Sequence, residues 1–165
     1  MIDRRMLLAA GAGLAGYAWL DRRNDMTALA DTFEVSRSED EWRQRLTSEQ
    51  FQVLRKHGTE RAGTSPLNRE KRKGTFACAG CDKPLFSSDT KFESGTGWPS
   101  FYAPLPDAVG TSTDKSWFMS RTEVHCGRCG GHLGHVFDDG PKPTGLRYCM
   151  NGVAMTFTPA EGAAS

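Results

Sequence analysis

Two Cys-x-x-Cys pairs constrain this chain more than any other feature of its sequence. Cys78 and Cys81 form the first pair, and Cys126 and Cys129 form the second. Each pair places two thiolates on one tight turn, and four thiolates make the ligand set of a closed tetrahedral zinc site. Residues 82–125 separate the pairs, far more than the roughly 15 to 20 residues of a compact zinc ribbon. A substantial insertion must therefore fold between the two halves of the site.

Two other uses of the paired cysteines stay open. In an oxidising compartment the pairs could form disulfides, and His125 or His132 could replace one cysteine as a ligand. A bridge between cysteines so close in the chain is strained, which favours metal. We therefore expect one structural Zn²⁺ on the four paired cysteines. Such a closed site has no open position for a substrate.

Cys149 is the fifth of the 5 cysteines and has no partner in the pattern. If residues 147–151 form a strand, the side chains of Arg147, Cys149 and Asn151 lie on one face. Positive charge near a thiol favours the thiolate, which is the reactive form. Cys149 is thus a candidate nucleophile. The alternative is a buried, inert cysteine, a common fate of free thiols.

Two histidines and a carboxylate follow the second cysteine pair directly. His135 and Asp139 share one face of a predicted strand, and His132 joins them only if Gly134 makes a bulge. Imidazoles next to a carboxylate, in one fold with an unpaired cysteine, indicate acid–base chemistry. We therefore expect these side chains to lie near Cys149.

The overall composition indicates one domain with little affinity for nucleic acid. The chain has 165 residues, with 21 basic and 20 acidic side chains and a net charge of +1. That balance leaves no electrostatic footprint for nucleic acid. We interpret the basic run at residues 69–73 as a solvated turn rather than as a binding patch.

Local signals predict two short helices followed by strands. Residues 38–41 and 47–50 each have the pattern of a capping box, and Gly58 is expected to end the second helix. From Gly74 onward, short alternating or aromatic-rich pieces are divided by glycine and proline turns. The predicted strands are 75–77, 84–86, 115–122, 123–125, 132–137 and 146–157. The fold class is therefore mainly β, an α+β fold with short N-terminal helices.

The N-terminus resembles a twin-arginine export signal. Arg4 and Arg5 precede an uncharged stretch at residues 6–20, and Ala28-Leu29-Ala30 offers a cleavage site. The stretch is short and diluted by glycine, so it is weak as a membrane span. We expect export to the periplasm, with an uncleaved N-terminal membrane anchor or a buried helix as alternatives. The expected organisation is a signal at 1–30, a linker at 31–37, a domain at 38–160 and a tail at 161–165.

Several motifs in order make the chain similar to a known family. They are Cys78-x-x-Cys81, Ser-Gly-Thr-Gly-Trp-Pro-Ser-Phe at 94–101, His-Leu-Gly-His-Val-Phe at 132–137 and Arg-Tyr-Cys-Met-Asn at 147–151. In these the chain resembles the B-type peptide methionine sulfoxide reductases, which act on the R epimer of the sulfoxide. The likeness runs from about Ser38 to Thr158. It implies a fold of two antiparallel sheets with N-terminal helices and a zinc site of four cysteines far from the active site.

The resemblance also implies roles for individual residues. Cys149 matches the nucleophile, and Trp98 matches the indole that packs on the methyl group of the sulfoxide, although an ordinary core tryptophan is the alternative. Further positions fall around the substrate and its oxygen: His132, His135, Phe137, Asp139, Arg147 and Asn151. Oxidised proteins or peptides are the implied substrates, and His135 is the expected acid. Attack by Cys149 would leave this residue as a sulfenic acid.

One position departs from the family pattern. Many members have a resolving cysteine in the 94–101 loop, where this chain has Thr96. With four cysteines on metal, no thiol remains to form a disulfide with the sulfenic acid. We therefore expect an external thiol reductant, either thioredoxin-like or a small thiol, and a monomeric enzyme.

Two rival functions fit part of the pattern. A non-catalytic interaction or chaperone module held together by zinc explains the paired cysteines but leaves Cys149, His132 and His135 without a role. A thiol-dependent hydrolase explains Cys149 with His135 but lacks an evident oxyanion loop.

Overall fold

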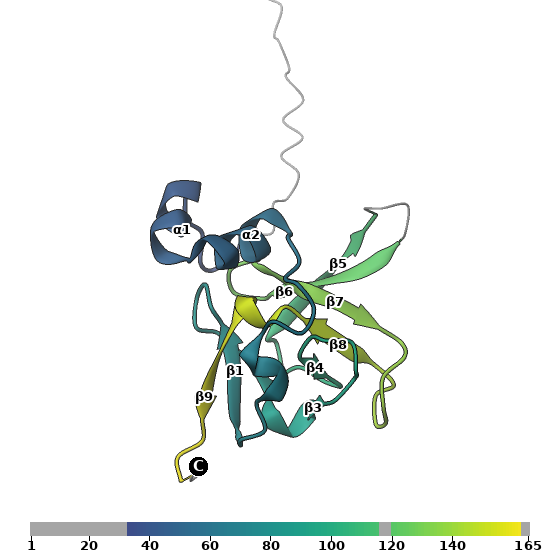
Figure 1. The fold of residues 1–165 in the computed structure, drawn as a ribbon. Helices are drawn as coiled ribbons and strands as arrows, with labels where there is room; N and C mark the ends of the chain where they lie inside the picture. The colour runs from purple at the N-terminus through teal and green to yellow at the C-terminus, as the bar shows by residue number, and fades with distance from the viewer. Residues whose placement is uncertain (1–32, 116–119, 163–165) are drawn as a thin grey trace, which may run out of the picture. The chain divides into compact units, whose positions relative to one another are not determined.

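The computed structural model describes residues 33–115 and 120–162. The predicted export signal at 1–30 lies outside these residues. Two helices, α1 (Glu39–Arg45) and α2 (Ser48–Lys56), open the described chain (Figure 1). No helix in the two described ranges is long and apolar enough to cross a membrane.

Both helices begin at the predicted capping boxes. The Ser38 hydroxyl accepts from the amide of Glu41 at 3.3 Å, and the Glu41 carboxylate accepts from the amide of Ser38 at 2.8 Å. Thr47 and Gln50 repeat the arrangement at 3.2 and 3.0 Å. Each box satisfies amide groups that a helix leaves without partners at its N-terminus. The second helix ends with His57 in the left-handed region, at φ 55°, one residue before Gly58.

The strands form two antiparallel sheets, as the resemblance implies. The smaller sheet has the order β2-β1-β9, with β1 at Gly74–Cys78, β2 at Pro84–Ser87 and β9 at Met155–Pro159. The larger sheet has the order β3-β4-β8-β7-β6-β5. Its strands are β3 (Lys91–Phe92), β4 (Ser100–Phe101), β5 (Val109–Asp114), β6 (Arg121–Cys126), β7 (His132–Phe137) and β8 (Arg147–Met150). Short 3₁₀ turns complete the fold: η1 (Pro66–Arg69), η2 (Ser88–Thr90) and η4 (Gly152–Ala154).

The prediction of one continuous strand at 146–157 is wrong. The segment divides into β8 and β9, which belong to different sheets, and η4 turns the chain between them. The alternation of apolar and polar residues could not reveal this break, because it is equally clear in both halves of the segment. The sequence pattern also missed β5, whose Gly, Thr, Ser and Asp residues pair only with β6 at the sheet edge. β3 and β4 have two residues each, too few to show a period.

Aromatic side chains bridge the two sheets in the core. The rings of Phe86 and Phe101 stack at 4.4 Å, and Phe76 meets Phe101 edge-on at 4.9 Å. All three are fully buried, as is Met150 of β8. A buried aromatic removes about 150–250 Å² of surface from water. Through Met150, β8, the strand of Cys149, is part of this core.

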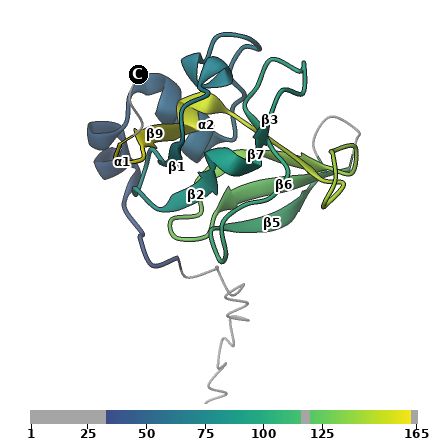
Figure 2. The same cartoon turned by 90° about the horizontal axis from the view of Figure 1, so that it is seen from below.

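The helices cover one end of this core. Trp42, Phe51 and Leu54 are buried, and α2 packs on β7 and η4. Figure 2 shows β1 and β9 on the same side as the helices, with β5, β6 and β7 in the neighbouring layer. The end of α2 is thereby brought to the strands that carry the predicted histidines.

Candidate active site and metal centre

The two cysteine pairs form equivalent turns at the ends of β1 and β6. In each turn, the amide of the first cysteine, Cys78 or Cys126, donates to the carbonyl of the residue five positions later. The amide of the residue four positions later donates to the carbonyl of that first cysteine, and all these distances are 2.8 to 2.9 Å. The residue after the second cysteine, Asp82 in one turn and Gly130 in the other, has a positive φ of 59° or 66°. The same backbone geometry thus presents two thiols from each turn.

The four sulfurs fit a tetrahedral metal site. All lie within 4.8 Å of one another, with Cys78 Sγ 3.8 Å from Cys129 Sγ and Cys81 Sγ 3.5 Å from Cys126 Sγ. A tetrahedron with Zn–S bonds of about 2.3 Å has edges of about 3.8 Å. The cysteines are free thiols rather than disulfides. The four cysteines predicted as ligands therefore form a cluster at metal-binding distance.

The surroundings of the cluster are built from the backbone and basic side chains. Arg55 donates to the carbonyl of Cys129 at 2.9 Å, and Arg128 donates to the carbonyl of Cys81 at 3.1 Å. Hydrogen bonds among the sulfurs lower the pKa of Cys126 and raise the pKa values of Cys78 and Cys129.

Cys149 lies on β8 in the interior of the larger sheet. It pairs with Ser100 of β4 on one side and with His135 of β7 on the other. Because directly opposed residues of an antiparallel pair point to the same face, the thiol and the imidazole are neighbours. Cys149 is half-buried rather than inaccessible. The structure therefore favours a reactive thiol over an inert core cysteine.

A cavity of about 130 Å³ opens at Cys149. Four other residues singled out in the sequence line it: Trp98, His135, Phe137 and Asn151. Thr59, Arg121 and Gly134 line it as well. No sequence signal identified Thr59 or Arg121, because the first lies on a loop after α2 and the second on a strand across the sheet. Of the other predicted residues, His132, Asp139 and Arg147 lie outside the lining of this cavity.

β7 contains the bulge on which the position of His132 depended. The register with β6 shifts so that Leu133 is the extra residue between His132 and Gly134. A Cβ atom on Gly134 would lie 2.2 Å from the carbonyl oxygen of Cys149, so only glycine permits this approach of β7 to β8. The bulge brings the rings of His132 and His135 together at 5.4 Å between centroids.

The carboxylate partners of the histidines differ from the predicted one. Nε2 of His135 lies 2.9 Å from Oδ2 of Asp114, on β5. Nδ1 of His132 lies 2.7 Å from Oε1 of Glu123, on β6. Burial lowers the pKa of His132. Asp139 was expected beside His135 on one strand face, but β7 ends at Phe137, so the face does not extend that far.

Asp139 instead forms an ion pair with Arg147. Nε and Nη2 of Arg147 each donate to one carboxylate oxygen of Asp139, both at 2.8 Å. The hydrogen bond to Asp139 is the largest cause that raises the pKa of Arg147. The guanidinium lies 4.4 Å from the centre of the Phe137 ring. Arg147 thus remains a cation near Cys149 while supporting one wall of the cavity.

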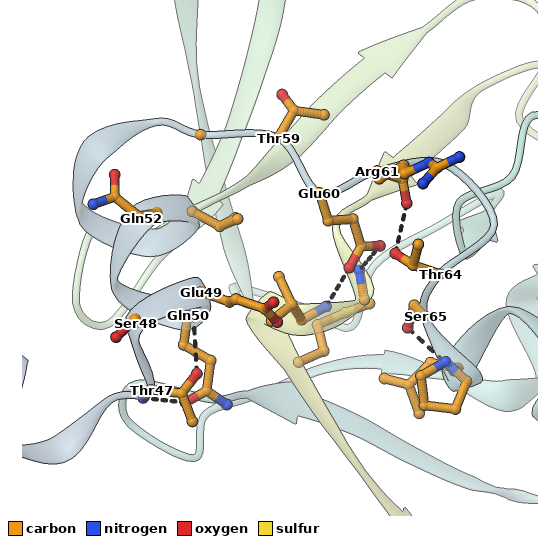
Figure 3. A pocket seen from close by; sticks show the side chains of 17 residues that line it. Thr47, Ser48, Glu49, Gln50, Gln52, Thr59, Glu60, Arg61, Thr64 and Ser65 are labelled. Atoms are coloured by element: carbon orange, nitrogen blue, oxygen red, sulfur yellow. Dashed lines mark hydrogen bonds between the residues drawn. The ribbon is translucent and has the colours of Figure 1, made fainter.

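Glu60 connects several parts of the site. Its carboxylate accepts from the amides of Gly152 at 2.7 Å and Val153 at 2.9 Å (Figure 3). Its carbonyl accepts from the indole Nε1 of Trp98 at 3.2 Å, and its amide donates to Asn151 Oδ1 at 2.9 Å. No sequence motif pointed to Glu60. It couples the loop after α2 to both Trp98 and the turn that follows Cys149.

The side chain of Asn151 is held by backbone groups. Its Nδ2 donates to the carbonyl of Leu133 at 3.0 Å, in addition to the bond from Glu60. β8 ends at Met150, so the prediction of a strand through Asn151 is wrong at its last residue. Asn151 caps η4 and still lines the cavity at Cys149.

A groove of about 810 Å³ lies beside the site. Figure 3 shows it between α2, the loop at 58–67 and η4, with Glu60 in its wall. Thr59 lines both this groove and the cavity at Cys149. The groove contains no thiol or imidazole among its described lining residues, so we place the chemistry at Cys149.

Thr96 is the polar group next to the thiol on the 94–101 loop. Its Oγ1 lies 3.7 Å from Sγ of Cys149. The hydroxyl also meets Ser94 Oγ at 2.8 Å, which in turn meets Ser100 Oγ at 2.7 Å. A hydroxyl therefore occupies the place beside Cys149 where a second thiol would be within reach.

Comparison with known proteins agrees with this geometry. The family model described as the SelR domain matches residues 46–159. Peptide methionine sulfoxide reductase MsrB of Agrobacterium fabrum is 55% identical over 127 residues, 76% of this chain and 94% of that protein. The protein of the same name from Methanosarcina barkeri is 57% identical over 128 residues, 77% of this chain and 90% of its own. Peptide methionine sulfoxide reductase B1, chloroplastic, of Arabidopsis thaliana is 54% identical over 128 residues, 77% of this chain but 63% of that protein.

Proposed function

The chain belongs to the SelR-domain family of peptide methionine sulfoxide reductases MsrB, and on this premise we propose that it reduces the R epimer of peptide-bound methionine sulfoxide. The observation that carries the proposal is the side-by-side placement of Cys149 and His135 in one cavity with Trp98. A thiol, an acid and an apolar wall are the groups that this reaction requires. The proposed biological role is the repair of oxidised proteins.

The chemical step moves one oxygen atom from substrate to enzyme. The Cys149 thiolate attacks the sulfoxide sulfur while the oxygen takes up a proton. The resulting hydroxyl then passes to the cysteine sulfur, as the bond between the two sulfurs and the bond from the substrate sulfur to oxygen both break. The products are methionine and the sulfenic acid of Cys149, so the cysteine sulfur is oxidised by two electrons and the substrate sulfur is reduced by two. Two external thiols then return Cys149 to the thiol, with release of water and a new disulfide between them.

His135 is the proposed acid for the departing oxygen. It lies opposite Cys149 in the sheet, and the contact between its Nε2 and the carboxylate of Asp114 orients its ring. Arg121 lines the same cavity and is paired with Asp114 at 2.7 Å, so it can contribute positive charge near the oxygen. Arg147 and Asp139 support the site from outside the lining, and the predicted role of His132 and Asn151 in catalysis stays a prediction.

Trp98 and Phe137 are proposed to contact the methyl thioether. Both line the cavity, and the indole of Trp98 is fixed by its bond to the carbonyl of Glu60. Aromatic rings make favourable contacts with the sulfur and methyl of methionine. A fixed ring excludes the opposite epimer more effectively than a mobile one because it cannot yield.

The cluster of Cys78, Cys81, Cys126 and Cys129 is proposed to hold one structural Zn²⁺. Four thiolates complete the coordination of the ion, so it supplies cohesion between the two turns and no chemistry to the substrate. None of these cysteines is among the described residues that line the cavity at Cys149.

The threonine at position 96 supports an external thiol donor, thioredoxin-like or small, and we propose that the enzyme acts as a monomer. We propose export to the periplasm through the twin-arginine signal, with an N-terminal anchor as the alternative. Replacing Arg4 and Arg5 with lysine is expected to retain the enzyme in the cytoplasm. Fractionation that finds the unaltered protein in the cytoplasm with residues 1–30 intact would refute the proposed location alone.

The proposed activity is tested with the two epimers of a methionine sulfoxide peptide and an added thiol. We expect reduction of the R epimer and none of the S epimer. Cys149→Ser should abolish the reaction, because this thiol supplies the electrons. The variant should keep its metal and its fold, because Cys149 does not belong to the cluster of four cysteines. Absence of reduction for both epimers in the metal-loaded protein would instead support a non-catalytic module.

A further inference from the structure

A second cluster of metal-binding side chains lies beside the proposed active site. Nδ1 of His57 is 3.0 Å from Oε1 of Glu123, and Nδ1 of His132 is 2.7 Å from the same oxygen. The three ligand atoms all lie within 4.8 Å of one another, and the two rings are 5.2 Å apart. Three elements meet here: the end of α2, β6 and β7.

The donor set and spacing suit a divalent transition metal. Two imidazoles and one carboxylate bind Zn²⁺ and related ions, with bonds of about 2.0 to 2.2 Å. Ligand atoms around such an ion are about 3.0 to 3.4 Å apart, depending on its geometry. Of the two distances to Glu123, the one at 3.0 Å already has this spacing and the one at 2.7 Å needs a small expansion, whereas the two histidine nitrogens lie within 4.8 Å of each other.

Two members of the cluster are largely buried, and one of them, Glu123, is held in place by a hydrogen bond. The side chains of His132 and Glu123 are 3% and 12% exposed, whereas that of His57 is 66% exposed. The second oxygen of Glu123 accepts from Ser112 Oγ at 2.6 Å, an outer contact that orients a metal-binding carboxylate. Although burial opposes ionisation, the hydrogen bonds of Ser112 and His132 lower the pKa of Glu123. The exposed His57 leaves a route of entry from solvent.

We propose that His57, Glu123 and His132 bind a divalent transition metal such as Zn²⁺, at a site separate from the four cysteines, and that this metal inhibits the enzyme. A cavity of about 500 Å³ adjoins the cluster, which leaves room for water to complete the coordination. This binding does not depend on the proposed function.

The inhibition rests on the proposed function and on what else lines the same cavity. His135, the proposed acid, and Asp114, the carboxylate that holds it, both face this space. A hydrated dication there would occupy the space beside His135 and attract the carboxylate of Asp114 away from the imidazole. The ring that must face the departing oxygen would then lose its support.

The binding is tested on protein whose cysteine cluster is already filled with zinc. The background is Cys149→Ser, so that the active-site thiol cannot act as a ligand. After metal analysis, Zn²⁺ is titrated in a calorimeter. We expect one further equivalent to bind, and His57→Asn to weaken it roughly tenfold or more. Asparagine is chosen because it tolerates the left-handed backbone of position 57.

A matched variant controls for the loss of an imidazole. His125→Gln removes a histidine whose ring packs on Phe33 at 5.7 Å, outside the cluster. This variant should bind the second equivalent as the parent does. Absence of a second equivalent, or equal affinity in His57→Asn and the parent, would overturn the proposed site and leave His57, Glu123 and His132 as a hydrogen-bonded network only.

The inhibition is measured in a single turnover, because dithiol reductants bind zinc. Reduced enzyme with Cys149 intact receives one equivalent of sulfoxide peptide, with or without added Zn²⁺, and the methionine formed is counted. Zinc should slow the parent enzyme and have little effect on His57→Asn, whose rate without zinc should equal that of the parent. Equal inhibition of both would place the effect elsewhere, such as on the thiolate, and refute the inhibitory role. An inactive parent would instead contradict the proposed function, while the calorimetry would still decide the site.

Discussion

Glu60 connects several parts of the active site although it has no proposed role in the reaction itself. It bonds through its carboxylate to two amides of η4, through its carbonyl to Trp98 and through its amide to Asn151. Only the carboxylate bonds depend on the side chain. They hold the turn that follows Cys149 against the loop after α2.

Replacing this carboxylate should lower turnover without removing the nucleophile. In Glu60→Gln an amide replaces an acceptor of two hydrogen bonds, and one of them must be lost or weakened. Hydrogen bonds to a charged group contribute about 1.5 to 3 kcal/mol each. We expect a melting temperature several degrees lower and a reduced kcat. Glu49→Gln, an exposed glutamate in the same groove, should change neither quantity.

Thr96 is the second single residue for which we expect a specific effect, in this case on the oxidised enzyme. Its hydroxyl lies 3.7 Å from the Cys149 sulfur. After one equivalent of sulfoxide without reductant, the unaltered enzyme should keep a sulfenic acid that a dimedone probe traps. Thr96→Cys should instead form a disulfide with Cys149, since a thiol at this position is within reach. Peptide mapping that finds a disulfide between Cys149 and a metal-cluster cysteine in the unaltered enzyme would refute the expectation.

At the scale of elements, the bulge in β7 organises the histidines. One extra residue returns His132 to the face of His135, and Gly134 permits the close approach to β8. A Cβ atom added to Gly134 would lie nearest to two backbone atoms of β8, and backbone atoms cannot rotate away as a side chain can. The geometry of the site therefore depends on a strand irregularity as much as on the residue types.

Gly134→Ala should disrupt this element. The added Cβ would meet the carbonyl oxygen of Cys149 at 2.2 Å, so one strand must shift. Overpacking of this kind typically costs about 1 to 3 kcal/mol and sometimes more. We expect lower stability in chemical denaturation and a large loss of activity. Gly80→Ala is the control, because its Cβ would find no atom nearer than 3.5 Å, and wild-type behaviour of both variants would contradict the assignment.

At the scale of the whole molecule, the cysteine cluster joins distant parts of the chain. It connects the end of β1 in the smaller sheet to the end of β6 in the larger sheet. Arg55 of α2 adds a bond to the carbonyl of Cys129, so the helices are attached to the same centre. A metal bound there would contribute directly to folding, because no such site exists in the unfolded chain.

Removing one ligand should therefore affect the entire domain. Cys126→Ser is expected to release the metal and lower the melting temperature severely, since structural zinc binding is worth on the order of 10 kcal/mol in small modules. Metal content and thermal unfolding are measured on the same sample. Cys149→Ser is the matched control with full metal content. A metal-free Cys126→Ser protein that melts like the parent would refute a structural role.

Local sequence determined the parts of this protein that local interactions build. The capping boxes placed α1 and α2 because each satisfies its own amides within three residues. The spacing of the cysteines marked two equivalent turns, and the motifs around Trp98, His135 and Cys149 marked the residues of one cavity.

Tertiary structure alone decided which side chains became partners. Asp114 rather than Asp139 meets His135, Glu123 meets both His132 and His57, and Glu60 meets the turn after Cys149. These contacts join residues 9 to 92 positions apart in the chain. Strand register, a bulge and the break between β8 and β9 set them. A one-residue change in register moves every side chain of a strand to its other face, so no local pattern can specify such pairs.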